Sequence, residues 1–491
     1  MHEKYKTDIF SLKLKTFRGI SLLIAREFFI KALATIGQII LVRFLAPEYF
    51  GIFAIITFII SFFELFTDIS FNQAIIRKKD KPDYLALSTI FFVREILTIL
   101  SVVILFIFAS YIVSFFSSFS TNEVLMIRVF SLTLLLKPLR SIIISILERE
   151  LRYDIIPRID IIGVLVYYIA VIFFSINHFY AWSFIWAVFI KEVVESAVAF
   201  CYHPWFPRFS FRFSSIKDMI KYGSYLQLGT VISFIHKSII PVIAGNRTSP
   251  YEVGLLDWSM NIASIPRSIT DNYGRVSFAA FSRIQSNRRL LSMAIEKSFG
   301  IISVICIFFS LITLGFGREL IQYILTNKWL PALPALNWFI GSIIFIGGTA
   351  SFGQALIAIG KTKEILIVST IVVIAEWFLS YTFLSIWNFT GIAMASFIGS
   401  LALFVLYIFL GRKNGLSVNL KNTFIYKSVL FCLMILLITL INYLLHGSLL
   451  FLILKLILVS TAYLLFSYLL CRNEVIEIFI LIKQTLKFIK K

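Results

Sequence analysis

Long apolar runs recur along the whole chain, and they restrict its fold more than any other feature. A run of about 20 apolar residues is long enough to cross a bilayer as a helix. With 59% apolar and only 15% charged residues, the chain also departs from soluble domains, in which these shares are about one half and one quarter. The sequence therefore predicts an all-α integral membrane protein. Fourteen transmembrane helices are expected, approximately at residues 18–45, 50–76, 85–115, 122–146, 154–176, 180–202, 217–246, 251–282, 290–317, 332–360, 364–386, 388–411, 424–445 and 448–471.

Basic residues gather on alternate loops between these runs. If the amino terminus is cytoplasmic, the inside segments carry 30 Lys and Arg, whereas the outside loops carry only Arg247, Arg318 and Lys328. Cytoplasmic loops of membrane proteins are enriched in Lys and Arg, so we expect both termini in the cytoplasm. The same rule accounts for the net charge of +20. We expect no nucleic-acid partner, since no basic domain stands outside the membrane.

Two stretches that lie 203 residues apart repeat each other. Residues 47–51 and 250–254 share the pattern P-x-x-x-G. The further equivalent positions are Glu64 and Arg267, Asp68 and Asp271, and Asn72 and Arg275. Both halves begin on the inside, so the repeat axis should run along the membrane normal, an arrangement that suits alternating access at a central cleft.

The repeat predicts two pseudo-symmetric six-helix bundles around a central cavity, plus two C-terminal helices. The expected parts are an N-terminal bundle at 1–202, a cytoplasmic linker at 203–216, a C-terminal bundle at 217–411, accessory helices at 424–471 and an amphipathic cytoplasmic tail at 472–491. Phe and Arg alternate in the linker, which indicates an anchor at the membrane interface. Besides Lys427, which is counted with the preceding cytoplasmic loop, the accessory helices contain one basic residue, Lys455, and they are expected to be an appendage.

Thirteen of the 46 basic residues fall inside expected spans. Each charge at the centre of a lipid-facing helix costs about 2.5–3.5 kcal/mol, so these groups must pair, lie near helix ends or line a wet interior. Acids close in sequence predict structural pairing for some of them, namely Glu27 with Lys31, Arg94 with Glu95, Lys191 with Glu195, and Glu296 with Lys297. The basic residues with no acid within a turn of their own helix are candidates for binding an anionic ligand, namely Arg128, Lys137, Arg140 and Lys237.

Lys137 and Arg140 flank Pro138 in the fourth expected span. A proline removes a helical hydrogen bond, and the break would free backbone groups to line a cavity. A substrate role for the pair and snorkelling of both side chains to the cytoplasmic surface stay open as alternatives.

The eighth expected helix carries a charged stripe, because Arg267, Asp271 and Arg275 lie at i, i+4 and i+8. Pro266 precedes the stripe and predicts a kink there. The corresponding face of the second helix, with Glu64 and Asp68, is negative. Either the two stripes pair as a gate, or the basic stripe binds substrate while Glu64 or Asp68 carries a coupling cation.

Other features carry less chemistry. His236 lies inside the seventh span and is a candidate for proton coupling, although a lone intramembrane histidine is more often a helix contact. The four cysteines are isolated in apolar runs, which predicts neither a disulfide framework nor a metal site. No Walker A, H-E-x-x-H or G-x-S-x-G motif occurs, and no outside loop exceeds about 15 residues, so the sequence offers little room for an enzyme.

Several segments resemble one bacterial family. LVRFLAPEYFGIFAI at 41–55, FTDISFNQAIIRKKD at 66–80, LERELRYDIIPRID at 147–160, and VGLLDW and SFAAFSRIQ in the second half are similar to the polysaccharide transporter family. These proteins are the repeat-unit flippases for O-antigen and exopolysaccharide within the multidrug/oligosaccharidyl-lipid/polysaccharide export superfamily. The similarity covers the first twelve expected helices. Members often have an acid near the end of helix 7, where this chain has His236 and Lys237, so the resemblance assigns no acidic coupling site here.

The resemblance implies a V-shaped central cavity, alternating access, location in the bacterial cytoplasmic membrane and undecaprenyl-diphosphate-linked oligosaccharide as cargo. The expected diphosphate or acidic-sugar ligands are Arg267, Arg275, Lys137, Arg140, Arg128 and Lys237, and the expected gating or coupling residues are Glu64, Asp68, Asp271 and His236. No cofactor is expected apart from coupling to H⁺ or Na⁺. The candidate partners are membrane lipids and other polysaccharide-assembly proteins.

Two other functions stay open. A cation-coupled multidrug exporter of the same superfamily would favour an acidic cavity, because its cargo is cationic. A membrane polysaccharide polymerase or ligase would need a long polar outside loop, which this sequence lacks.

Overall fold

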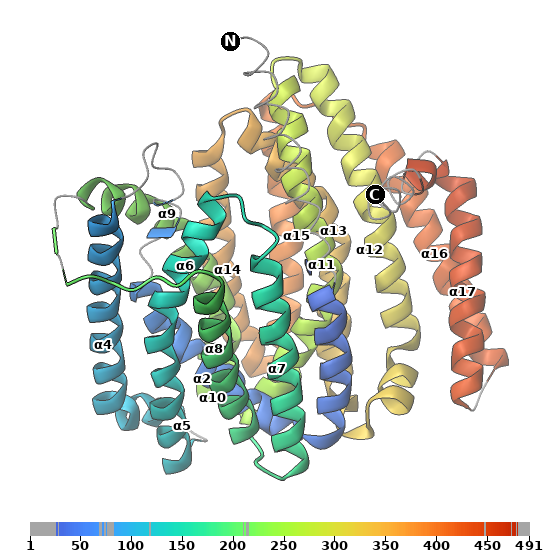
Figure 1. The fold of residues 1–491 in the computed structure, drawn as a ribbon. Helices are drawn as coiled ribbons and strands as arrows, with labels where there is room; N and C mark the ends of the chain where they lie inside the picture. The colour runs from blue at the N-terminus through green and yellow to red at the C-terminus, as the bar shows by residue number, and fades with distance from the viewer. Residues whose placement is uncertain are drawn as a thin grey trace. The chain divides into compact units, whose positions relative to one another are not determined.

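A computed structural model gives the fold of the chain. It describes residues 26–27, 29–67, 71–72, 75, 83–116, 119–209, 211–212, 216–445, 448–472, 474–477 and 479. Within these ranges it describes only the backbone at residues 218, 220–226, 228–229, 268–269, 271–273, 275–276, 279 and 420–424. The described residues contain helices and no strands (Figure 1), so the predicted all-α class is confirmed.

The chain divides into two compact units, Met1–Gly254 and Leu255–Lys491. The first unit holds a helix at 29–44 followed by α2 (Pro47–Thr67), α4 (Tyr84–Ser114), α5 (Thr121–Ser131), η1 (Leu132–Leu136), α6 (Lys137–Arg149), α7 (Ile156–Ile176), α8 (Trp182–Tyr202), α9 (Lys217–Lys237), η3 (Ile240–Ala244), α10 (Gly245–Arg247) and the first turn of α11 (Pro250–Ile284). The second holds the rest of α11 and then α12 (Arg288–Ile324), η4 (Asn327–Ala332), α13 (Leu333–Ala358), α14 (Thr362–Trp387), α15 (Thr390–Lys413), α16 (Leu420–Leu444) and α17 (Leu449–Leu470). The domain boundaries expected from the sequence stay a prediction.

Each of the fourteen expected ranges is mainly helical where the structure describes it, with non-helical residues chiefly at the range ends, such as 154–155 and 388–389. Ten helices among the described residues are long and apolar enough to cross a membrane by length and composition. α8 is not among them, because Lys191, Glu192 and Glu195 lie in the middle of its 21 residues. The exact count of fourteen spans therefore stays a prediction.

Prolines shape the helices at several points. α2 begins at Pro47 and α11 at Pro250, as suits a residue that lacks the N–H which an α-helix leaves unpaired in its first turn. The interruption expected at Pro138 is present, since the 3₁₀ turn η1 directly precedes α6. A π-helical turn, η3, surrounds Pro241. α11 continues past Pro266 as a helix, although this proline has no N–H for the carbonyl of Ile262.

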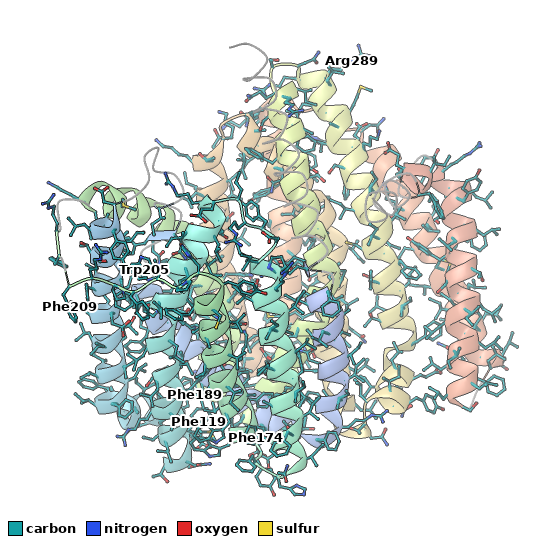
Figure 2. The ribbon with its side chains drawn as sticks, in the orientation of Figure 1. Phe119, Phe174, Phe189, Trp205, Phe209 and Arg289 are labelled. Carbon is teal, nitrogen blue, oxygen red and sulfur yellow. The ribbon has the colours of Figure 1, made fainter. Side chains whose placement is uncertain are left out.

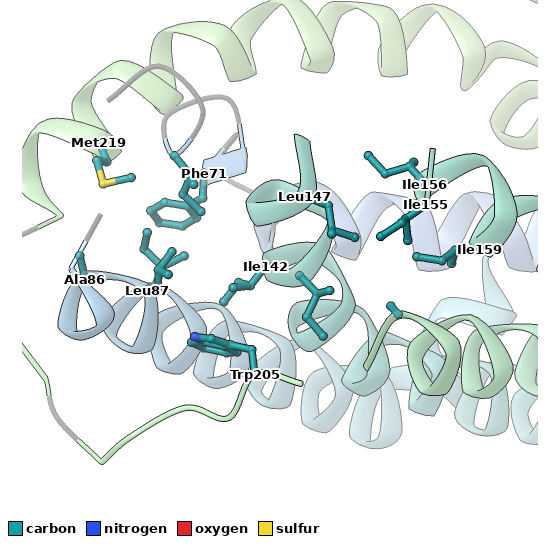
Figure 3. Close-up of a cluster of buried hydrophobic side chains, with 14 of the residues drawn as sticks. Phe71, Ala86, Leu87, Ile142, Leu147, Ile155, Ile156, Ile159, Trp205 and Met219 are labelled. Atoms are coloured by element: carbon teal, nitrogen blue, oxygen red, sulfur yellow. The ribbon is translucent and has the colours of Figure 1, made fainter. Parts of the chain in front are cut away.

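A hydrophobic cluster holds the first unit together (Figure 3). It joins Leu87 on α4, Ile142 on α6 and Ile159 on α7, and it also receives Trp205 from the segment after α8. Burying these side chains contributes roughly 1.5–3 kcal/mol each. The segment at 203–209 is therefore fixed to the unit through Trp205, which is only 5% exposed.

The same segment also binds α4 through its backbone. Tyr84 donates its hydroxyl to the carbonyl of Phe206, and Ser88 Oγ accepts from the Arg208 N–H at 3.1 Å. Phe209 is 99% exposed and stacks on Phe92 (Figure 2). The expected membrane-interface anchor stays a prediction, and the fixed backbone and outward Phe209 suit it.

The accessory helices α16 and α17 contact the rest of the second unit through α12. They pack on α12 around a second hydrophobic cluster that includes Met434 and Val459 (Figure 1). Lys455 of α17 is 2% exposed and donates to Glu319 of α12 at 2.6 Å. A buried ammonium needs such a partner, so this ion pair helps to fix the helix pair to α12, and the interpretation of the pair as an appendage stays a prediction.

Candidate functional site

The two P-x-x-x-G motifs of the repeat contact each other within the first unit. A Cβ at Gly51 would overlap the carbonyl oxygen of Pro250, and a Cβ at Gly254 would overlap the carbonyl oxygen of Pro47. The same hypothetical atoms would lie 2.8 Å and 3.0 Å from the backbone nitrogens of Gly254 and Gly51. The first turns of α2 and α11 thus cross backbone to backbone, at a distance that only glycine allows.

A network of ion pairs lies among the helices of the same unit. Its members, which we call the charge network, are the cations Arg26, Lys137, Arg140 and Lys191 and the acids Glu64, Asp160, Glu192 and Glu195. They come from the first helical segment, α2, α6, α7 and α8. Each cation of the network lies within 3.7 Å of an acid, which offsets the cost of removing a charge from water.

Arg140 is the branching point of the charge network. One guanidinium nitrogen lies 3.0 Å from Glu192 Oε2, and the other pairs with Glu195 Oε2. The planar fork of Arg suits two acceptors at once, whereas Lys offers a single point charge. Both carboxylates are almost fully buried, with 7% and 5% of their side chains exposed.

Glu195, one of the two acids that pair with Arg140, also contacts residues of α8 and α7. Lys191 lies 3.7 Å from Glu195 one helical turn away, which confirms the pair predicted at i and i+4. Gly163 on α7 makes room for this carboxylate, since a Cβ at Gly163 would lie 2.5 Å from the Glu195 carboxyl carbon. A side chain at position 163 would have to displace the Glu195 carboxylate.

The remaining network contacts join helices far apart in the sequence. Lys137 donates to Glu64 Oε2 at 2.7 Å across α6 and α2. Arg26 lies 2.7 Å from Asp160 on α7. Both pairs keep partial exposure, with 39% of the Glu64 side chain and 26% of the Asp160 side chain open.

A polar cluster joins Asn72, which lies between α2 and α4, to side chains of α4 and α6. Asn72 Oδ1 accepts from Arg94 at 3.1 Å, from Ser141 at 2.8 Å and from Ser145 at 2.9 Å. Arg94 also donates to Ser141 Oγ at 2.6 Å. The structure places the Arg94 guanidinium on the Asn72 amide oxygen and the Ser141 hydroxyl. The pair expected between Arg94 and its neighbour Glu95 stays a prediction.

The structure brings together three of the predicted site residues, Glu64, Lys137 and Arg140. The sequence offered Lys137 and Arg140 as cations without an acid within a turn of their own helix, and acids from α2 and α8 neutralise them in the structure. The pairing of Glu192 and Glu195 with Arg140 was not predicted from the sequence. A charged triplet in the middle of α8, opposite a proline-broken helix with two cations, is the signal that could have found the pairing.

The other predicted residues lie elsewhere or outside the described part. Arg128 Nε donates to the carbonyl of Phe106 at 3.1 Å, away from the network. His236 and Lys237 form the last turn of α9. Arg267 is exposed on α11 in the second unit. Asp68 lies outside the described residues, and so do the side chains of Asp271 and Arg275, whose backbones belong to α11.

The pair predicted between Glu296 and Lys297 is replaced by contacts to other segments. Lys297 pairs with Glu477, and Glu296 accepts from the backbone N–H of Asn419 at 2.5 Å. Among the described residues, no group of three or more His, Cys, Asp or Glu is arranged to hold a metal ion.

Known proteins resemble this chain in both sequence and fold. A curated relative, described as an uncharacterized membrane protein in the cps region of Klebsiella pneumoniae, is 27% identical over 333 residues, which are 67% of this chain and 68% of the relative. Among solved structures, the lipid II flippase MurJ in an inward closed conformation has a TM-score of 0.78 at 16% identity, over 92% of this chain and 99% of that one. An inward-facing multidrug resistance MATE family transporter of the MOP superfamily has a TM-score of 0.63 at 15% identity, over 80% of this chain and 98% of that one.

At such low identities these two structures show the fold alone, which is that of the MOP-superfamily transporters. The sequence match to a family extends over residues 40–334, from the end of the first helical segment to the start of α13. It therefore includes the charge network except for Arg26, and it includes both P-x-x-x-G motifs. The chain belongs to the family described as polysaccharide biosynthesis protein, which confirms the resemblance inferred from the sequence.

Proposed function

We propose that this protein is a non-enzymatic flippase that moves undecaprenyl-diphosphate-linked oligosaccharide repeat units from the inner to the outer leaflet of the bacterial cytoplasmic membrane. The proposed cargo serves O-antigen, capsule or exopolysaccharide assembly. The relative from a cps region and the fold shared with a lipid II flippase support this assignment. The observation that carries it is the position of Lys137 and Arg140, which hold cationic groups among membrane-spanning helices while keeping 23% and 21% of their side chains exposed.

A diphosphate explains why cations at this depth are useful. Its charge cannot cross hydrocarbon alone, and guanidinium and ammonium groups offer it charge-assisted hydrogen bonds. Arg140 supplies a fork that can bind two phosphate oxygens, and Lys137 supplies a point charge three residues before it. We assign these two residues to the diphosphate.

The proposed orientation follows from the loop charges. The 30 basic residues on alternate loops support cytoplasmic termini. Coupling to H⁺ or Na⁺ through Glu64, Asp68, Asp271 or His236 is part of the proposal. Fusions of a periplasm-active phosphatase at 247 and at 412 would test the orientation, since only the first should be active.

The direct test is flipping by the purified full chain in proteoliposomes that contain a fluorescent undecaprenyl-diphosphate oligosaccharide. The intact protein should expose the label to an external quencher, and Arg140→Ala should reduce the initial rate at least tenfold. Lys297→Ala is the matched control, because it removes an ion pair with Glu477 outside the charge network, and its rate should stay within twofold. Equal flipping by Arg140→Ala and the intact protein would refute the assignment.

The same vesicles separate the rival function. A multidrug exporter would move an organic cation such as ethidium and leave the lipid-linked sugar in place. The fold of this chain is compatible with that function, because a MATE family transporter has a similar fold. Export of ethidium without any flipping would replace our proposal with this one.

A further inference from the structure

The cations that we assign to the cargo are already occupied by acids of the chain itself. Arg140 lies between Glu192 and Glu195, and Lys137 donates to Glu64. An incoming diphosphate can reach these donors only if the carboxylates leave them. Loading of the site is therefore an exchange of one set of anions for another.

The two acids on α8 resemble the ligand that they would give way to. Glu192 and Glu195 are three residues apart, so both carboxylates project from one face of the helix. They present anionic oxygens to both arms of one guanidinium. Two linked phosphates offer a similar pair of acceptors.

The contact with Glu192 is the less complete of the two. Its Oε2 atom lies 3.0 Å from the guanidinium but accepts no aligned hydrogen bond, although the atom is buried. Glu195 in turn has a second cation, Lys191, at 3.7 Å. When Arg140 turns to another anion, Glu195 keeps Lys191 as a partner within the charge network, whereas Glu192 loses its contact with the guanidinium.

We propose that Glu192, Glu195 and Glu64 compete with the diphosphate of the cargo for Arg140 and Lys137. They hold Arg140 and Lys137 in place when no cargo is present, lower the affinity for the diphosphate and promote its release by returning to the cations. This inference rests on the proposed function, because it assigns the same two cations to the cargo. It adds the prediction that removing an acid improves binding.

Binding by the full chain in nanodiscs tests this competition. The probe is geranyl diphosphate, with geranyl monophosphate and geraniol as comparison ligands, and calorimetry gives the dissociation constant. Glu192→Gln preserves the shape of the side chain and removes its charge, so the dissociation constant for the diphosphate should fall about tenfold, as for the loss of one charge-assisted competitor. Glu64→Gln should lower it by a smaller factor, since the more exposed Glu64 is better solvated. Geraniol binding should not change.

A steric variant tests the same idea without altering any charge. Gly163→Ala places a methyl group where the Glu195 carboxylate lies, so it should push this acid from Arg140 and tighten diphosphate binding. Gly399→Ala is the matched control in the second unit. There a Cβ would lie 3.1 Å from the carboxyl carbon of Glu376, which is no part of the charge network, and binding should stay the same.

The outcomes separate this inference from the proposed function. If the intact protein does not distinguish geranyl diphosphate from geraniol, and Arg140→Ala changes nothing, the proposed site itself is wrong. If Arg140→Ala weakens binding but neither Glu64→Gln nor Gly163→Ala strengthens it, the site stands and the competition is refuted. Glu64→Gln decides the matter if Glu192→Gln does not fold, because Glu64 is partly exposed and tolerates the loss of its charge.

Discussion

Replacing Gly51 or Gly254 by alanine should separate two helices that now touch through their backbones. In each case the new methyl group would overlap a carbonyl oxygen, that of Pro250 for Gly51 and that of Pro47 for Gly254. A backbone carbonyl cannot turn away as a side chain can, so α2 and α11 must move apart at their first turns. Overpacking of this kind costs about 1–3 kcal/mol, which exceeds the gain of up to about 1 kcal/mol from replacing glycine by alanine in a helix.

Gly51 and Gly254 lie at the same helix crossing, so the variant that carries both Gly51→Ala and Gly254→Ala is informative. Once one methyl group has separated the helices, the second finds the space already open. The two losses should therefore not add, and Gly51→Ala with Gly254→Ala should be less destabilising than the sum by at least about 0.5 kcal/mol, as for residues in direct contact.

The free energy of unfolding of the three variants, measured by steric trapping in bicelles, tests this reasoning. Gly341→Ala is the control, because a Cβ there would meet only the ring edge of Phe397 at 3.2 Å, and it should change stability little. Additive losses, or single variants as stable as the intact protein, would show that the helices do not cross as closely as the structure has them.

Three further changes test other parts of the structure. Lys455→Met leaves Glu319 without its cation and should destabilise the protein by about 3 kcal/mol. This is the lower end of the cost of breaking a buried ion pair, because 28% of the Glu319 side chain is exposed. Adding Glu319→Gln should restore most of the lost stability in the same unfolding assay. Trp205→Ala empties a buried site and should cost about 3–5 kcal/mol, whereas Trp205→Phe should cost much less, because the buried indole N–H has no hydrogen-bond partner to lose. Arg267→Ala and Arg275→Ala should each abolish surface polysaccharide in a complemented deletion strain while the protein still inserts, and normal polysaccharide with either variant would remove that residue from the substrate site.

Local spacing predicted what helix geometry alone determines. Lys191 and Glu195 meet because residues four apart share a helix face. The prolines at 47, 138 and 250 mark helix starts or a break for equally local reasons. The hydropathy pattern likewise predicted the helical ranges, since it depends only on length and composition.

Contacts between helices could not be predicted in the same way. Lys137 and Glu64 are 73 residues apart, and nothing in either helix specifies that α6 lies against α2. The repeat identified the two P-x-x-x-G motifs as equivalent but did not show that they touch. Glycine at both positions was the available signal, because a close crossing of two backbones requires it on each side.

The charge network is not expected to make the folded protein more stable than apolar side chains would, and this favours a role in transport. Replacing a buried ion pair or triad by apolar side chains of similar volume is often neutral or stabilises a protein by about 1–4 kcal/mol. The variant with Arg140→Met, Glu192→Leu and Glu195→Leu should therefore fold at least as well as the intact protein, and Lys191 can reach solvent because 30% of its side chain is exposed. If the network serves only to hold helices together, this variant should still flip the lipid-linked sugar in proteoliposomes. If Arg140 serves the cargo, flipping should be lost while the free energy of unfolding is preserved, and the two measurements together separate the explanations.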